Sequence, residues 1–146
     1  MSDDLTLLDA NVLVYASFPA SEYYSASRKI LESAATAEAG LCVTYQVLAE
    51  FFSVVTNPKR VHRPRSPEEA IRAVETILAL PGISILPAPA DVPRRWIELM
   101  RRRPATGAEI FDFQLLATML ANGVRRIYTF NRPDFEGFEE LTVLAP

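Results

Sequence analysis

The sequence predicts an α/β fold with a mainly parallel central sheet of about five strands flanked by helices. Short apolar runs alternate along the chain with longer segments of helical periodicity, which is the pattern of repeated strand–helix units. The 146 residues are 49% hydrophobic and 23% charged, a composition typical of a globular protein. This length suits one domain, so we expect residues 1–146 to form a single α/β domain.

The predicted elements follow one another with short connections. The strands are the apolar runs at residues 5–8, 41–43, 83–86, 126–129 and 141–144. The helices are the periodic segments at residues 10–17, 22–38, 45–56, 67–80, 90–103 and 109–121.

Local signals at the boundaries support the helices of the first half. Asp9 follows the first strand and can cap the helix that begins at the next residue, which Pro19 then stops. Ser21 is a suitable N-cap for the second helix, and Gly40 follows its end. Thr44 can cap the third helix directly after the second strand.

In the second half, Ser66 and Pro67 followed by two acids form a strong helix start. We expect this helix to face inward with Ile71, Val74, Ile77 and Leu78. The helix at residues 109–121 is apolar on almost every side, so it is expected to be buried.

Several classes of protein are excluded or disfavoured by composition. With one cysteine and one histidine, the chain can form neither an internal disulfide nor a zinc site of nitrogen and sulfur ligands. His62 lies among arginines and a proline, a setting unlike that of a Ser-His-Asp triad. Asp3 and Asp4 stand where a signal peptide would be basic, and the longest charge-free stretch is broken by prolines. We therefore expect a cytoplasmic protein with no membrane partner.

Four acids stand near the predicted carboxyl edge of the sheet: Asp9 after the first strand, Glu50 on the third helix, Asp112 in the apolar helix and Asp134 after the fourth strand. Ligands of parallel α/β sheets bind at this edge. Clustered carboxylates repel one another unless a cation lies between them, and oxygen ligands suit Mg²⁺ or Mn²⁺. Read singly, Asp9 can be a helix cap, Glu50 an exposed edge residue and Asp112 a helix-dipole partner.

The charge balance leaves nucleic acid open as a partner. The net charge is −3, and it becomes +1 when those four acids are neutralised by metal. Thirteen of the fifteen basic residues are arginine, which binds phosphate through two parallel hydrogen bonds. Two other metal-carboxylate α/β families fit poorly: haloacid-dehalogenase-type phosphatases need an acid where Asn11 stands, and both they and response-regulator receivers need a lysine beyond Lys59.

Four segments in this order resemble the motifs of the PIN-domain nucleases, and within them most closely the VapC-type toxins of bacterial toxin–antitoxin pairs. The resemblance covers nearly the whole chain and rests on Leu8–Leu13, Val47–Phe51, Glu109–Gln114 with Ala117, and Thr129–Phe135.

The resemblance implies that Asp9, Glu50 and Asp112 are catalytic, metal-binding acids. The fourth motif departs from the simplest pattern, because many members carry Asp where Asn131 stands. Asn131 can coordinate through its carbonyl oxygen without adding charge, and Asp134 would then supply the fourth catalytic carboxylate.

Other residues acquire supporting roles from the same resemblance. Asn11 and Thr129 would orient the carboxylates, and Glu109 would be an additional acid at the rim. The candidate phosphate contacts are Arg101, Arg102, Arg103 and Arg132. At least two of the three consecutive arginines are equally well explained as a solvated helix end that complements the helix dipole.

The implied activity is metal-assisted endonucleolytic cleavage of RNA with one or two Mg²⁺ or Mn²⁺ ions. The implied partners are an RNA substrate, a small VapB-type antitoxin and a second copy of the chain in a homodimer. The alternative is a PIN-fold module that has lost catalysis and only binds RNA or protein, as Asn131 in place of an acid would allow. Five aromatic residues are candidates either for a partner groove or for the core: Tyr23, Tyr24, Phe51, Phe52 and Trp96.

Overall fold

The structure, a computed structural model, describes residues 5–146; Asp3 and Asp4, which bear on a possible leader, lie outside the described residues. Its sheet has five strands in the order β3-β2-β1-β4-β5, and every neighbouring pair is parallel. The strands are β1 (Thr6–Leu8), β2 (Leu41–Thr44), β3 (Ile83–Leu86), β4 (Arg126–Tyr128) and β5 (Thr142–Leu144). The predicted parallel α/β fold with about five strands is confirmed.

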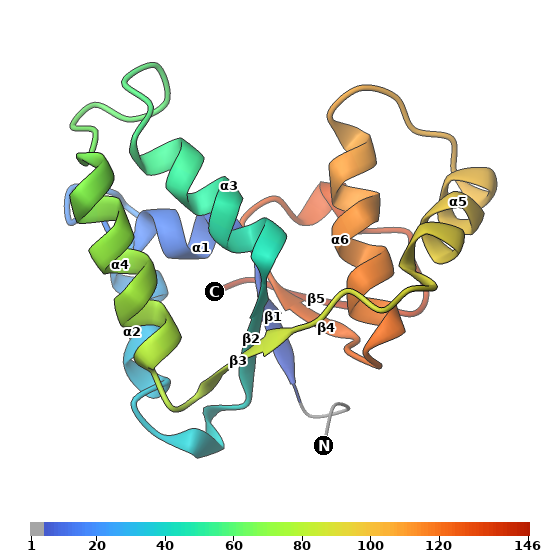
Figure 1. The fold of residues 1–146 in the computed structure, drawn as a ribbon, viewed down its shortest axis with the longest axis horizontal. Helices are drawn as coiled ribbons and strands as arrows, with labels where there is room; N and C mark the ends of the chain where they lie inside the picture. The colour runs from blue at the N-terminus through green and yellow to red at the C-terminus, as the bar shows by residue number, and fades with distance from the viewer. Residues whose placement is uncertain (1–4) are drawn as a thin grey trace.

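Helices cover the sheet on two sides, with α1 to α4 grouped on one side and α5 and α6 together on the other (Figure 1). No helix within residues 5–146 is long and apolar enough to cross a membrane. The helices are α1 (Ala10–Tyr15), α2 (Tyr24–Ser33), α3 (Tyr45–Val55), α4 (Pro67–Ala79), α5 (Val92–Arg102) and α6 (Glu109–Ala121), with short 3₁₀ turns η2 (Ala37–Ala39) and η3 (Arg132–Asp134).

The larger of two apolar cores lies between the sheet and helices α1, α3 and α4. The strand residues Leu7, Val43 and Ile127 are fully buried, and Phe51 on α3 is 1% exposed. Strands buried on both faces are typical of a parallel sheet covered by helices, which explains their continuous apolar sequences.

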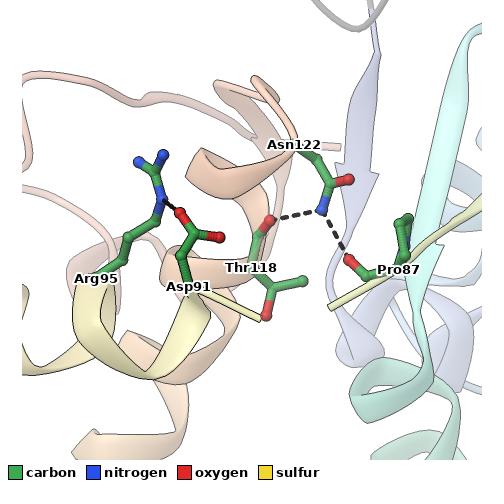
Figure 2. Close-up of polar contacts among 5 residues, drawn as sticks. All are labelled: Pro87, Asp91, Arg95, Thr118 and Asn122. Carbon is green, nitrogen blue, oxygen red and sulfur yellow. Dashed lines mark hydrogen bonds and ion pairs between the residues drawn. The ribbon is translucent and has the colours of Figure 1, made fainter. Parts of the chain in front are cut away.

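The smaller core joins α5 and α6. Leu99, Leu116 and Phe138 are buried in it, and the Trp96 indole donates a 3.0 Å hydrogen bond to the carbonyl of Ile110. At the far end of α6, the Asn122 amide donates 2.8 Å hydrogen bonds to the carbonyls of Pro87 and Thr118 (Figure 2). This one side chain therefore connects the end of α6 to the segment that leads from β3 to α5.

The helix starts at Thr44 and Ser66 are confirmed. The Thr44 hydroxyl accepts a 3.1 Å hydrogen bond from the amide of Val47. Ser66 and Glu69 form a reciprocal capping box, in which each side chain accepts from the other residue's amide at 3.1 Å. These local pairings need no tertiary contact, which is why the sequence predicts them well.

The second helix is shorter than predicted. It covers Tyr24–Ser33 rather than residues 22–38, its N-cap is Tyr23, and the Ser21 hydroxyl accepts only from the Tyr23 amide. At its end, the carbonyl of Ala34 accepts a 2.8 Å hydrogen bond from the amide of Gly82. Since this carbonyl would bond the amide four residues later in a continuing helix, the contact with Gly82 favours termination there.

Two predicted burial patterns are wrong in part. The inner face of α4 is formed by Ala70 and Ile77, whereas Ile71 and Leu78 are 49% and 43% exposed. The first turn of α6 is also accessible, with Phe111 57% exposed, and burial begins at Phe113. The first turn of α6, which carries the helix's two acids Glu109 and Asp112, therefore lies outside the apolar core, and the exposed Phe111 lies with it.

Candidate active site at the carboxyl edge of the sheet

Asp9 occupies the point where the strand order reverses. Its strand, β1, lies between β2 and β4, and the amide of Asp9 donates a 3.0 Å hydrogen bond to the carbonyl of Tyr128 at the end of β4. In open parallel sheets, ligands bind in the crevice at such a reversal, outside the carboxyl ends of the strands.

The Asp9 carboxylate is buried, with 8% of the residue exposed, and it is held by three hydrogen bonds. The amide of Ala10 donates to Oδ1 at 2.8 Å, so Asp9 caps α1 as the sequence allows. The Thr129 hydroxyl donates to Oδ2 at 2.8 Å, and the Asn11 amide donates to the same oxygen at 3.2 Å. Burial nevertheless raises the pKa of Asp9 above its usual range.

Asn11 and Thr129 connect Asp9 to the loop after β4. The Asn11 side chain donates to the Thr129 hydroxyl at 3.2 Å and accepts from the amide of Phe130 at 3.3 Å. The Thr129 hydroxyl also accepts from the amide of Asn131 at 3.0 Å. This network fixes the rotamer of the Asp9 carboxylate and positions the loop that carries the fourth predicted motif.

Glu50 reaches the same site from α3. Partial loss of hydration raises the pKa of its carboxyl, and the charge of Asp9 raises it further, whereas Arg60 lowers it. The influence of Asp9 shows that the two carboxylates interact electrostatically. Arg60 follows the end of α3, and the sequence pattern did not indicate its influence on Glu50.

Asp112, in the first turn of α6, has the largest shift among these acids. Burial raises its pKa to about 7, with further contributions from Asp134, Asp9, Glu50 and Glu109, in that order. The structure therefore brings together all of the acids that the sequence selected, with Asp112 in the field of the other four.

The fourth motif forms the 3₁₀ turn η3. Asn131 precedes this turn and its carbonyl accepts a 3.1 Å hydrogen bond from the amide of Asp134. Both side chains are exposed, and the Asp134 charge raises the pKa of both Asp9 and Asp112. Asp134 is therefore the acid of the fourth motif, and its charge acts on Asp9 at the end of β1 and on Asp112 in the first turn of α6.

The oxygen donors at this edge of the sheet are of the type that binds a hard divalent cation such as Mg²⁺. Within residues 5–146, no three His, Cys, Asp or Glu side chains are arranged so that they could hold an ion as they stand. The chemistry of the cluster does fit such an ion, because it consists of carboxylate oxygens that disfavour one another's charge. Among residues 5–146, Arg60 is the cation that lowers the pKa of one of the three acids Asp9, Glu50 and Asp112, and it acts on Glu50.

The four predicted phosphate contacts have different surroundings. Arg102 pairs with Glu140 at 2.6 Å, and Arg103 donates to the carbonyl of Glu136 at 2.7 Å while lying over the Phe138 ring. Arg132, beside Asn131, is 3.8 Å from the Glu136 carboxylate. Arg101 is exposed and makes no hydrogen bond or ion pair with the described part of the chain.

Three of the five aromatic candidates lie in different surroundings. Phe51 belongs to the larger core, Trp96 packs on the smaller core, and Phe52 lines an exposed apolar groove of about 580 Å³. The groove lies between α3, α4 and β3 and is lined by Tyr45, Leu48, Ala49, Phe52, Val74, Leu78 and Ile85.

The structure also contains a cluster of three aromatic rings, next to the Asn11 network, that was not predicted from the sequence. Tyr15, Tyr23 and Phe130 have ring centroids 4.5–5.2 Å apart. Two of the three rings could have been placed near the site from the sequence, because Tyr15 lies one helical turn after Asn11 and Phe130 immediately precedes Asn131.

Known proteins with similar sequences are ribonucleases by name. The chain is 36% identical over 118 residues to the VapC ribonuclease Mb2897 of Mycobacterium bovis and to ribonuclease VapC43 of Mycobacterium tuberculosis; each match covers 79% of this chain and 78% of the relative.

Solved structures share the fold. VapC20 of Mycobacterium tuberculosis, a sarcin-ricin loop cleaving toxin, superimposes with a TM-score of 0.68 at 15% identity, covering 97% of this chain and 99% of the other. VapBC2 of Rickettsia felis, solved with a DNA fragment from its promoter, gives 0.66 at 18% identity, covering 97% and 98%. The sequence profile of the PIN domain matches residues 6–140, a range that includes all four acids, and the chain therefore belongs to the PIN domain family.

Proposed function

We propose that this protein is a metal-dependent endoribonuclease and the toxin of a type II toxin–antitoxin pair. The observation that carries the proposal is the cluster of acids around Asp112, whose pKa is raised to about 7 by burial and by four neighbouring carboxylates. Catalytic sites commonly concentrate such mutually perturbed acids. The two relatives at 36% identity are both named as ribonucleases, which supports RNA as the substrate.

In this proposal, Asp9, Glu50, Asp112 and Asp134 hold Mg²⁺ or Mn²⁺, and Asn131 is a neutral ligand through its side-chain oxygen. A bound divalent ion would activate water and stabilise the charge that develops on the scissile phosphate. Asp9 is the most firmly positioned donor, because it is buried and hydrogen bonded on both oxygens.

The remaining side chains position these donors or the substrate. Asn11 and Thr129 hold the Asp9 carboxylate in one orientation, and Glu109 adds negative charge near Asp112. Arg132 is the best placed of the four arginines for the RNA phosphate, since it adjoins Asn131 and its ion pair with Glu136 is long and exposed. Arg101 is a second candidate, whereas Arg102 and Arg103 are engaged with the chain itself.

A protein partner is part of the same proposal. Solved neighbours include toxin–antitoxin complexes from Klebsiella pneumoniae and Haemophilus influenzae, which share this fold at 18% and 14% identity. Exposed apolar surfaces such as the groove at Phe52 are typical of interaction sites. We propose a small VapB-type antitoxin and a homodimer, with RNA cleavage in the cytoplasm.

The test is cleavage of total RNA by the purified chain with Mg²⁺ or Mn²⁺. Cleavage that EDTA abolishes and that Asp112→Asn lacks supports the proposal. RNA binding without cleavage under both metals indicates the alternative, a PIN-fold binding module without catalysis. Light scattering and co-purification with the product of an adjacent small gene test the two protein partners.

A further inference from the structure

Three aromatic rings form a contiguous cluster beside the acidic site. The Tyr23 and Phe130 ring centroids are 4.5 Å apart, and the rings are tilted by 35°. The Tyr15 ring meets Phe130 edge-on at 5.2 Å and Tyr23 at 5.0 Å. The rings come from α1, from the residue before α2, and from the loop after β4, so the cluster exists only in the folded chain.

The cluster is physically continuous with the carboxylates. The Phe130 amide donates to Asn11, and Asn11 donates in turn to Asp9. Tyr15 lies four residues after Asn11 on α1, which places it about one helical turn, or ~5.4 Å along the axis, from that position. The Phe130 backbone is therefore joined to Asp9 through one side chain, that of Asn11.

Burial distinguishes this cluster from aromatic packing in the core. Phe113 and Phe138 also pack ring to ring, but they are 2% and 5% exposed. Tyr23 is 39% exposed although it contacts two other rings. Its neighbours fix the orientation of the ring while part of its surface stays in contact with solvent.

We propose, on the basis of the nuclease function proposed above, that Tyr23, supported by Phe130 and Tyr15, stacks against an unpaired base of the RNA next to the scissile phosphate. Stacking on aromatic side chains is the usual way in which proteins hold single-stranded RNA, because every base offers a flat face. A base inside a duplex has both faces covered by its neighbours. The site therefore selects an unpaired segment of RNA, such as a loop or a single strand.

The local charge favours a base over a phosphate at this position. The adjacent Glu22 carboxylate raises the pKa of the Tyr23 phenol, so the ring stays neutral beside a negative charge. A phosphate would be repelled there, whereas an uncharged base would not. Arg132, on the other side of Asn131, is the group suited to the phosphate.

The test compares Tyr23→Leu, Tyr23→Phe and a control, Ile97→Ala. Ile97 on α5 is 42% exposed, close to the 39% of Tyr23, and it lines neither the ring cluster nor the apolar groove. The substrate is an RNA that the unmodified chain cleaves, used alone and annealed to its full complement. Tyr23→Leu keeps an apolar side chain but removes the aromatic face, and we expect KM to rise about 5- to 100-fold with a smaller change in kcat.

Tyr23→Phe and Ile97→Ala should keep KM within about twofold of the unmodified chain, and the annealed RNA should resist cleavage. A second measurement uses 2-aminopurine placed next to the cleavage site, whose fluorescence should be quenched on binding to the unmodified chain and not to Tyr23→Leu. Equal KM and quenching for Tyr23→Leu and the unmodified chain, or equal loss in Tyr23→Phe and Tyr23→Leu, would overturn the stacking proposal alone. Absence of RNA cleavage by the unmodified chain would overturn the nuclease function and the stacking proposal together.

Discussion

Replacing Asp112 by Asn should stabilise the metal-free protein above neutral pH while abolishing RNA cleavage. Asp112 is only partly accessible and lies in the field of Asp134, Asp9, Glu50 and Glu109, so its negative form is disfavoured in the folded chain. Asn has nearly the same shape and never carries this charge. The substitution therefore removes repulsion without leaving a cavity.

The magnitude follows from the pKa of Asp112, which is 3.8 as the ordinary value and about 7 in the folded protein. A shift of about 3 pKa units corresponds to about 4 kcal/mol at 1.36 kcal/mol per unit. The side chain is partly exposed, so solvent screens much of this energy, and we expect about 1–2 kcal/mol.

The sign and the pH window follow from proton linkage. Because the folded-state pKa is raised, the folded chain binds the Asp112 proton more tightly than the unfolded chain does. This contribution to stability is fully present below about pH 4 and is lost as the pH rises through about 7. The Asp112→Asn variant should therefore have a smaller loss of stability than the unmodified chain across that interval.

The assay is urea unfolding in EDTA at pH 5 and pH 8, repeated with Mn²⁺. Glu98→Gln on α5 is the control, because it also converts an acid to an amide, but at an exposed position that is not among the acids acting on Asp112. At pH 8, Asp112→Asn should be more stable than the unmodified chain without metal and should gain less from Mn²⁺. If Asp112→Asn is instead less stable at pH 8 without metal, the acid has a structural role and the electrostatic reasoning is wrong.

Three further substitutions test other parts of the structure. Thr129→Val removes the hydroxyl that donates to Asp9, and should lower the free energy of unfolding by about 1–3 kcal/mol in urea titrations, whereas intact stability would show that this hydrogen bond is dispensable. Asp134→Asn should weaken Mn²⁺ binding in calorimetry and Asn131→Asp should preserve or tighten it; the opposite pattern would show that Asp134 is not a ligand. Gly82→Ala should destabilise the fold by about 1–3 kcal/mol, because a methyl group there meets the Thr36 carbonyl and lies 2.7 Å from the Ala34 Cα; an unchanged melting temperature would mean that the neighbouring backbone yields easily.

The sequence could predict features that depend on neighbours in the chain. Strand and helix order follow from hydrophobic periodicity, and the helix starts at Thr44 and Ser66 follow from side chains that bond amides three residues away. The parallel arrangement follows from the alternation of strands and helices. The four acids could be selected as candidates because each one stands close to the end of a strand or in an otherwise apolar helix.

Features that join distant segments could not be predicted in this way. The helix α2 ends where the Ala34 carbonyl meets Gly82, which is far away in the sequence. The inner face of α4 depends on how that helix is rotated against α3 and β3, so Ile71 remains exposed despite its apolar side chain. Arg102 pairs with Glu140 only because the loop before β5 returns to α5.

The candidate site likewise has some features that the sequence predicts and others that only the tertiary fold sets. Residue types and spacing in the sequence identify Asp9, Asp112 and their partners, but the raised pKa of Asp112 depends on its distance from carboxylates of three other segments, besides Glu109 on its own helix. The contact of Tyr15, Tyr23 and Phe130 likewise requires α1, the start of α2 and the end of β4 to meet. Coulomb interactions and ring packing depend on distance in space, and only the tertiary fold sets that distance for residues far apart in the chain.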